Sequence, residues 1–196
     1  MIKKTIFTTV IFLILSTIIS TKADDIKDFE IEGISIGDSA LKYFTEDEII
    51  MNIRKNSYEG SDGLFFDAQF EDNNYEIYEQ VTLTFKKNDK QYTIYSLGGL
   101  IFYDNKKNCI NDYKKIAKDV EKLFPNHVKD TINNKHQQDP SGKSFINGIT
   151  FTDENYSGAE VSCYSWSKEM NLYDYVLVAI DTGEFGKWLQ NYYNNL

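Results

Sequence analysis

The sequence predicts an α+β fold, in which an antiparallel sheet built from hairpins has helices packed on one face. Two segments, 80–97 and 160–180, alternate apolar and polar residues on either side of a polar turn, as β-hairpins do. Each is followed by a segment with apolar residues at helical spacing, 108–124 and 182–194. Because the strands come in adjacent pairs, antiparallel pairing is favoured. The repeated β-β-α order has two interpretations, an internal duplication or a common local arrangement used twice.

An export signal is predicted at the start of the chain, over residues 1–23. Lys3 and Lys4 provide a positively charged start, and an apolar run extends from Thr5 to Ser20. These are the first two parts of a secretory signal peptide. An uncleaved membrane anchor is the alternative, but this run is shorter than the ~20 apolar residues of a spanning helix.

The cleavage site of this signal is expected between Ala23 and Asp24. Thr21 and Ala23 put small residues at the two positions that a signal peptidase reads. Residues 24–196 are then expected to form a single α+β domain, since a chain of this length suits one domain rather than two. The sequence has no second stretch that approaches a membrane span, so we expect the mature chain in the periplasm or secreted.

The composition excludes several classes of protein. The 196 residues include 30 Asp and Glu against 21 Lys and Arg, which gives a formal net charge of −9. An acidic balance argues against a nucleic-acid partner, since phosphate binding needs a basic surface. Aromatic residues make up 15% of the chain, which excludes a disordered protein, a class that is poor in them.

The first part of the mature chain is predicted to be a short strand followed by two short helices. Residues 29–36 alternate apolar and polar side chains, as a strand does. Asp38 is expected to cap the first helix. Thr45 and Glu48 have the spacing of a capping box, which predicts the start of the second. Residues 54–76 show no clear pattern beyond a polar, glycine-containing loop at their start.

The middle of the chain contains the clearest helix. Apolar residues recur at helical spacing from Cys109 to Phe124, and Pro125 ends the pattern. Before it, the hairpin is expected to turn at 86–90, and Gly98-Gly99 to mark a bulge or bend.

The last third is predicted to return to strands. Residues 126–143 are polar and are expected to be loop, with a turn at 139–142, and a strand is expected over 145–151. Asp181 and Glu184 have the spacing of a second capping box, which would start the last helix.

Cys109 and Cys163 are the strongest candidate pair for chemistry. Export would place both in an oxidising compartment. One starts a helix and the other lies in the middle of a strand, so a helix packed on the sheet would bring them together. We predict a structural disulfide. A reactive thiol at Cys109, near a helix N-terminus, and two separate buried thiols are the alternatives.

No cofactor and no metal site is predicted. His127 and His136 do not have the spacing of a zinc site, although a Cys–His pair with either cysteine is an alternative to surface positions. Carboxylates are plentiful, but no pair stands out as an acid–base pair. The start of a calcium loop is present from Asp72 to Glu76, but Ile77 stands where the loop needs glycine, which leaves a weak calcium site at most. The sequence contains neither a phosphate loop nor a nucleophile elbow.

Aromatic residues concentrate in the second hairpin. Tyr164, Trp166, Tyr173 and Tyr175 are expected to share it. An exposed patch of this kind could bind a sugar or a peptide. The alternative is that the rings lie inside the sheet and stabilise it by cross-strand pairing.

Three segments, Asp28–Leu41, Tyr95–Tyr103 and Asp181–Phe185, carry a resemblance. Together they resemble an uncharacterised family of small exported proteins from marine alphaproteobacteria with AT-rich genomes, over nearly the whole mature chain. That family has no assigned function, so the resemblance implies no catalytic residue. Residues 33–39 before a helix pair and a hairpin are also similar to the beta-lactamase-inhibitor and outer-membrane-assembly lipoprotein architecture, without its lipidated cysteine.

These observations favour a non-enzymatic periplasmic binding or envelope-interaction protein with an unknown protein, peptide or glycan ligand. A concave face of the sheet is the expected recognition surface. The alternative is a hydrolase-like periplasmic enzyme that uses scattered carboxylates or a Cys–His pair. Converging carboxylates in a deep pocket would favour the enzyme, and an exposed aromatic patch on the sheet would favour binding.

Overall fold

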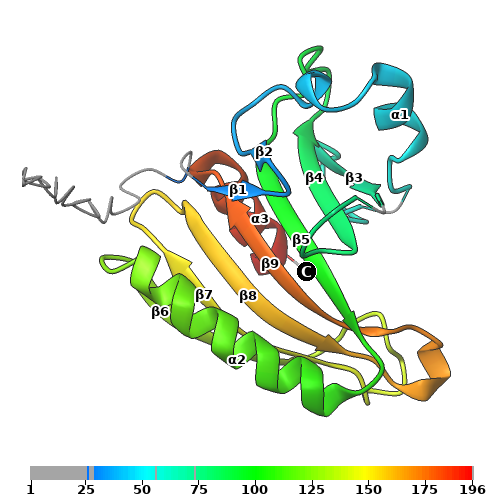
Figure 1. Ribbon diagram of the computed structural model, residues 1–196, viewed down its shortest axis with the longest axis vertical. Coiled ribbons are helices and arrows are strands. Elements are labelled where there is room, and N and C mark those ends of the chain that lie inside the picture. The colour runs from blue at the N-terminus through cyan, green and yellow to red at the C-terminus, as the bar shows by residue number, and fades with distance from the viewer. Residues whose placement is uncertain (1–25, 27–28, 56, 73, 196) are drawn as a thin grey trace, which may run out of the picture.

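The computed structural model describes residue 26 and residues 29–55, 57–72 and 74–195, so the predicted signal and its cleavage site lie outside the described residues. Seven strands form one antiparallel sheet in the order β3-β4-β5-β9-β8-β7-β6 (Figure 1). The predicted α+β class is thereby confirmed. The strands are β3 (Phe65–Phe70), β4 (Gln80–Lys86), β5 (Ser96–Tyr103), β6 (Val128–Lys135), β7 (Phe145–Thr152), β8 (Gly158–Ser165) and β9 (Asp174–Asp181).

The two predicted hairpins lie side by side at the centre of the sheet, as β4–β5 and β8–β9. The bulge predicted at Gly98-Gly99 is wrong, because both glycines lie inside β5 and pair in regular register with Thr82 and Val81. Gly99 is required for another reason, because a Cβ there would lie 2.4 Å from the ring of Tyr78. Glycine therefore lets this ring pack on the strand.

The two edge strands, β3 and β6, lie in segments whose sequence predicts no strand. β6 is exposed at nearly every position, so it lacks the alternation of a half-buried strand. β3 lacks it because both of its faces are covered. Ala68 and Phe70 belong to the core on one side, while Phe65 packs against a helix on the other.

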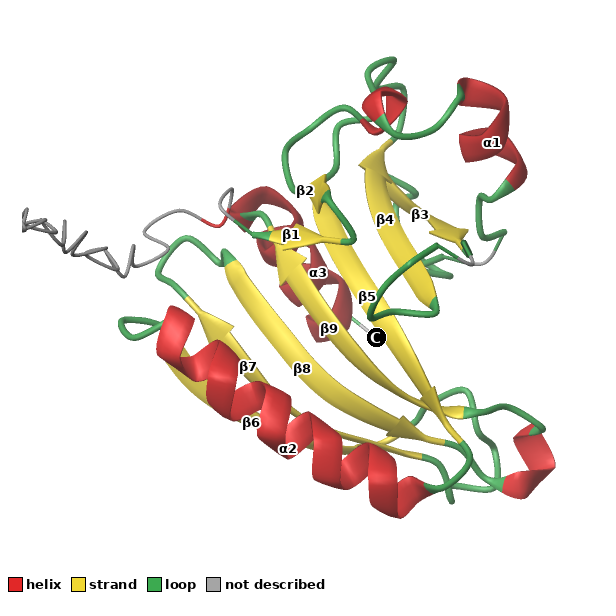
Figure 2. Cartoon of the chain, in the orientation of Figure 1, coloured by secondary structure: helices red, strands yellow, loops and turns green. Residues whose placement is uncertain are grey.

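One face of the sheet is covered by the long helix α2 (Lys106–Leu123), which Figure 2 shows in front of the strands. Cys109, Tyr113 and Ala117 are the buried residues of α2, and they pack over β8 and β9. The side chain of Asn105 caps the helix by accepting a hydrogen bond from the amide of Asn108. The predicted helix is confirmed, with a start three residues earlier.

The N-terminal segment covers the rest of the same face. Its buried isoleucines form one core with residues of β3, β4 and β5. The capping box of Thr45 and Glu48 forms as predicted. The elements are β1 (Glu30–Ile31), β2 (Ile34–Ser35), the 3₁₀ helix η2 (Ala40–Lys42) and α1 (Glu46–Met51).

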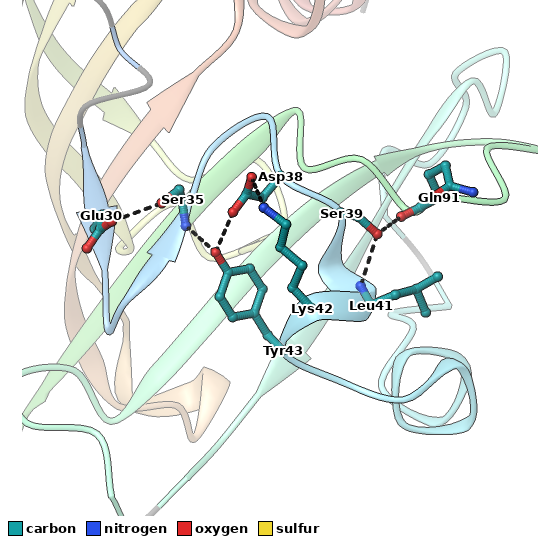
Figure 3. A network of polar contacts seen from close by, with 8 residues as sticks. All are labelled: Glu30, Ser35, Asp38, Ser39, Leu41, Lys42, Tyr43 and Gln91. Carbon is teal, nitrogen blue, oxygen red and sulfur yellow. Dashed lines mark hydrogen bonds and ion pairs between the residues drawn. The ribbon is translucent and has the colours of Figure 1, made fainter.

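Asp38 does not cap η2; Ser39 does, through a hydrogen bond from the amide of Leu41. Asp38 is held instead by Lys42 and by the hydroxyl of Tyr43, each at 2.6 Å (Figure 3). The Ser39 hydroxyl also donates to the carbonyl oxygen of Gln91. The bond from Ser39 to Gln91 joins the N-terminal segment to the loop between β4 and β5.

The last helix, α3 (Gly183–Asn194), lies on the opposite face of the sheet, so the expectation that the helices share one face is corrected. Phe185 and Trp188 of α3 pack on Phe65, with ring centroids 5.3 and 5.1 Å apart. Phe65 and Ala68 are an odd number of positions apart in β3 and point to opposite faces. Since α2 and the N-terminal segment already fill the face of Ala68, α3 packs on the other one.

The capping box predicted at Asp181 and Glu184 does not form. Asp181 is the last residue of β9, and its carboxylate accepts a hydrogen bond from the hydroxyl of Ser96. The cap is Thr182, whose side chain accepts from the amide of Phe185. Glu184 forms an ion pair with Lys86.

The positions of α2 and α3 also bear on the duplication interpretation. β5 and β9 are adjacent and antiparallel, so a two-fold axis that exchanges them must run perpendicular to the sheet. Such an axis would leave both helices on one face. Because they lie on opposite faces, the arrangement favours the use of one local solution twice.

The side chain of Glu32 anchors the loop before β4. Its carboxylate accepts hydrogen bonds from the backbone amides of Glu76, Ile77 and Tyr78, at 2.8 to 2.9 Å. Burial raises the pKa of Glu32, but the three amides outweigh it and hold the pKa below its usual value.

Replacing Glu32 with glutamine is expected to cost about 2 kcal/mol of stability at pH 7, because the charge-assisted bonds are lost. A group with a lowered pKa stabilises above its unfolded pKa and loses that effect as the pH falls through the folded one. The difference should therefore become smaller as the pH falls, as measured by urea unfolding at pH 7 and pH 3. Glu154→Gln, in an exposed turn, is the control, and equal stability of the two variants at pH 7 would contradict the anchoring role.

Candidate functional site

Cys109 and Cys163 are joined as predicted. The two sulfur atoms lie 2.01 Å apart and the Cα atoms 5.6 Å apart, the geometry of a disulfide between α2 and β8. Both residues are fully buried. The described chain contains no free cysteine, so neither the reactive thiol nor a Cys–His pair is present.

The two histidines lie at opposite ends of β6. His127 precedes the strand and packs edge-on against Phe124, and His136 follows it and packs on Trp166, with ring centroids 4.2 Å apart. Burial lowers the pKa of His136, although the nearby Asp139 works against it. Both rings therefore have packing roles, and they are not brought together.

Ser144 and Asp139 lie close to His136 without forming a catalytic triad. The Ser144 hydroxyl donates to Asp139 Oδ2 at 2.6 Å and accepts from the amide of Ser167 at 2.8 Å. His136 Nδ1 accepts from the amide of Gln138, so the ring does not stand between serine and aspartate as a triad requires. The group ties the β6–β7 connection to the β8–β9 connection.

Three carboxylates project from the face of the sheet that carries α3. Asp67 in β3 accepts hydrogen bonds from the hydroxyls of Thr84, at 2.7 Å, and Tyr58, at 2.9 Å. Asp181 lies in the same row of paired residues, two strands beyond Thr84. Glu160 lies in the adjacent row, where it pairs with Ala179. The sheet thus brings together on one face carboxylates that are far apart in sequence.

Burial makes these carboxylates hard to ionise. It raises the pKa of Asp181 to about 7, a rise that the hydrogen bond from Ser96 opposes and the charges of Glu160 and Asp67 increase. Burial also raises the pKa of Asp67 and of Glu160. None of the three forms an ion pair within the described part of the chain. At least one of them is therefore expected to hold a proton near neutral pH.

A metal centre has no support in the residues that the structure describes. They contain no group of three or more His, Cys, Asp or Glu side chains placed to hold an ion. In the candidate calcium loop, Asp72 Oδ1 accepts from the backbone amide and the side chain of Asn74. This is a local turn in which the carboxylate is already engaged.

Aromatic side chains form a row next to the three carboxylates on the α3 face of the sheet, and the Tyr164 hydroxyl donates to Glu160 Oε1 at 3.5 Å. Tyr164 and Tyr175 are paired on β8 and β9 and stack with ring centroids 4.8 Å apart. Phe102 on β5 is the next in the row, with its ring centroid 6.0 Å from that of Tyr175. The ring centroid of Tyr173 lies 6.5 Å from that of Phe102. We call these four residues the aromatic row. Trp166, which was expected among them, packs on His136 instead.

A hollow of about 390 Å³ opens at the exposed end of the aromatic row. Phe102 and Tyr173 form its aromatic wall, and Glu71 and Asp104 line it with carboxylates. The Tyr173 side chain is 69% exposed. We call this the Tyr173 hollow. It is open to solvent.

Sequence reasoning found Tyr164, Tyr173 and Tyr175 but missed Phe102 and the two carboxylates of the hollow. Phe102 belongs to the first hairpin, and only the pairing of β5 with β9 brings it beside the second. The signal that could have found it is the aromatic pair Phe102-Tyr103 at the end of an alternating strand.

Comparisons with protein-family models, with curated proteins and with solved structures found no match to this chain. Within the described residues, no helix is both long and apolar enough to cross a membrane.

Proposed function

We propose that this protein is an exported, non-enzymatic binding protein that recognises its ligand with the aromatic row and the Tyr173 hollow. The observation that carries this proposal is the largely exposed Tyr173 ring beside Phe102, at the mouth of a hollow with carboxylates on its rim. An exposed tyrosine beside a second ring offers a large apolar contact area with a polar tip to a ligand. This patch fits recognition better than it fits packing.

The chemistry of the patch suits binding without reaction. Tyrosine offers a large contact area and a polar tip while losing little conformational entropy, because it has few rotatable bonds. The hollow is at the small end of ligand pockets, so it would take one side chain or one ring of a longer ligand. The remaining contacts would come from the row of rings on the sheet.

Export is supported by two separate features. Residues 1–23 have the pattern of a cleaved signal. The Cys109–Cys163 pair has disulfide geometry, and disulfides persist in oxidising compartments such as the periplasm.

Replacing Tyr173 with alanine is expected to weaken ligand binding at least tenfold, because an anchor ring at the centre of the contact is removed. The measurement is a glycan and peptide array probed with the labelled mature chain, followed by titration of the strongest ligand. Tyr156→Ala is the matched control, since Tyr156 is an exposed tyrosine in the turn at the other end of β8. Equal loss in both variants, or none in either, would contradict the proposed surface.

The hydrolase alternative has one observation in its favour, the protonatable Asp181 with Glu160 on the adjacent strand. Such a pair is the type used in glycoside hydrolysis. On our proposal, chromogenic glycosides and peptides are not turned over. Turnover by the native chain that Asp181→Asn and Glu160→Gln each abolish would overturn the non-enzymatic assignment.

A further inference from the structure

A second hollow, of about 520 Å³, lies next to the Tyr173 hollow. Its aromatic wall includes Phe44 and Phe70, whose rings stack with centroids 3.8 Å apart. Tyr75 also lines it, and we call it the Tyr75 hollow. The two hollows have Glu71 as a common lining residue, and we call the two together the track.

The charge on this track is of one sign. Glu48, Glu71 and Asp72 line the Tyr75 hollow, and Asp104 lines the Tyr173 hollow with Glu71. Of the residues that the structure describes, no lysine, arginine or histidine lines either hollow. Within the described residues none of these carboxylates forms an ion pair. A concave surface lined by one sign of charge concentrates ligands of the opposite sign.

The Tyr75 hollow is also lined by uncharged polar groups. The hydroxyl oxygen of Tyr75 is buried and has no hydrogen-bond partner among the described residues. Buried polar atoms normally have one. The side-chain amides of Asn52 and Gln69 line the same hollow. Each donates a hydrogen bond within the chain, to the carbonyl oxygen of Glu48 and to the hydroxyl of Thr82, and its amide oxygen can accept one from a peptide N–H.

We infer that this track binds an extended peptide segment that carries several lysine side chains, an inference that rests on the proposed function and names its ligand. Carboxylates distributed over two hollows match positive charges spaced along a chain. The aromatic walls can pack on the lysine stems and lie near their ammonium groups, a favourable arrangement for a cation and a ring. The amides would bond the peptide backbone. Since an exposed ion pair contributes little by itself, the ligand must engage several carboxylates at once.

The test is a titration of the mature, disulfide-bonded chain with fluorescently labelled hexalysine, followed by anisotropy. Glu71→Gln should weaken binding at least fivefold, because Glu71 contributes to both hollows and the glutamine keeps its shape. Glu154→Gln removes the same charge from an exposed turn at the far end of β8, and it should change binding less than twofold. Hexalysine with acetylated side chains should not bind measurably.

The outcomes separate this inference from the proposed function. Equal effects of Glu71→Gln and Glu154→Gln, binding of the acetylated peptide, or no binding of hexalysine would overturn the lysine-peptide assignment. Spermine that competes as strongly as hexalysine would overturn the peptide part of it. If another array ligand still depends on Tyr173, the proposed function stands without the inference. If hexalysine depends on Glu71 but not on Tyr173, the proposed aromatic surface fails.

Discussion

Replacing Asp181 with asparagine is expected to stabilise the protein at neutral and alkaline pH and to flatten the dependence of its stability on pH. Burial raises the pKa of Asp181 from 3.8 to about 7. Between these values the folded chain binds more protons than the unfolded chain. Stability from this group is therefore complete below pH 3.8 and is lost as the pH rises through 7. The full difference amounts to up to about 4 kcal/mol.

Burial is the main cause of this loss of stability, and the neighbours of Asp181 modify it. Ser96 donates one hydrogen bond to its carboxylate, while the charges of Glu160 and Asp67 act against its ionisation. Tyr193 of α3 also lies within the field of these carboxylates. An asparagine still accepts the bond from Ser96 and brings no charge, so the gain should appear only where the native aspartate ionises.

Urea unfolding of the native chain and of Asp181→Asn at intervals from pH 4 to pH 8 measures this directly. The two curves should approach each other near pH 4 and separate as the pH rises. Asp130→Asn, on the exposed strand β6, should leave the profile unchanged. A variant less stable than the native chain at pH 8 would show that the ionised carboxylate is used in the folded state, and our account of the site would be wrong.

Removing the disulfide is expected to cost about 4 kcal/mol. Cys109 and Cys163 are 54 residues apart, and cross-linking a loop of this length restricts the unfolded chain by about that amount in the chain-entropy account. The Cys109→Ala, Cys163→Ala chain should unfold at a lower urea concentration than the native chain. Since the free energy of unfolding of most domains is only about 5 to 15 kcal/mol, a large part of the stability depends on this bond.

A reductant provides the control for the disulfide prediction. Dithiothreitol should destabilise the native chain to about the level of the double-alanine variant and should not affect the variant itself. Unfolding midpoints that coincide for the native chain with and without reductant, once reduction is verified by thiol titration, would contradict the prediction. That result would mean that the buried packing of α2 on β8 holds the two elements together without the bond.

The elements predicted correctly are those whose pattern is local. β8, β9 and most of β4 alternate because one face of each is buried, and α2 has its apolar residues at helical spacing for the same reason. The capping box at Thr45 and Glu48 spans four residues and forms. The errors at Asp181, Glu184 and Gly98-Gly99 have a common cause, which is that a competing partner comes from a distant segment.

Asp181 illustrates this competition. Its spacing from Glu184 is that of a capping box. However, its carboxylate accepts a hydrogen bond from Ser96, 85 residues earlier, and Glu184 forms an ion pair with Lys86. Gly98 and Gly99 look like a bend from their neighbours alone. They are in fact strand residues, because their missing side chains make room for Tyr78 and for Leu177 of the adjacent strand.

The sequence predicted that aromatic residues form the candidate site, but it did not predict the full set of residues that line it. The pattern of the second hairpin predicted the three tyrosines of the aromatic row. The pairing of β5 with β9 places Phe102 beside Tyr175 and so adds it to the site. Glu71 and Asp104 came to this end through the loops that follow β3 and β5, and no local signal marked them.

By itself, the sequence determined the α+β class, the two central hairpins, the long helix and the cysteine pairing, because each depends on periodicity or on the count of one residue type. It also determined the acidic charge and the signal-like start. Only the tertiary structure decided the face on which α3 packs, the gathering of Asp67, Asp181 and Glu160 on that face and the track of two hollows. Each of these arises where strands far apart in the chain become neighbours, and the burial and the fields that result are properties of that arrangement and of no single segment.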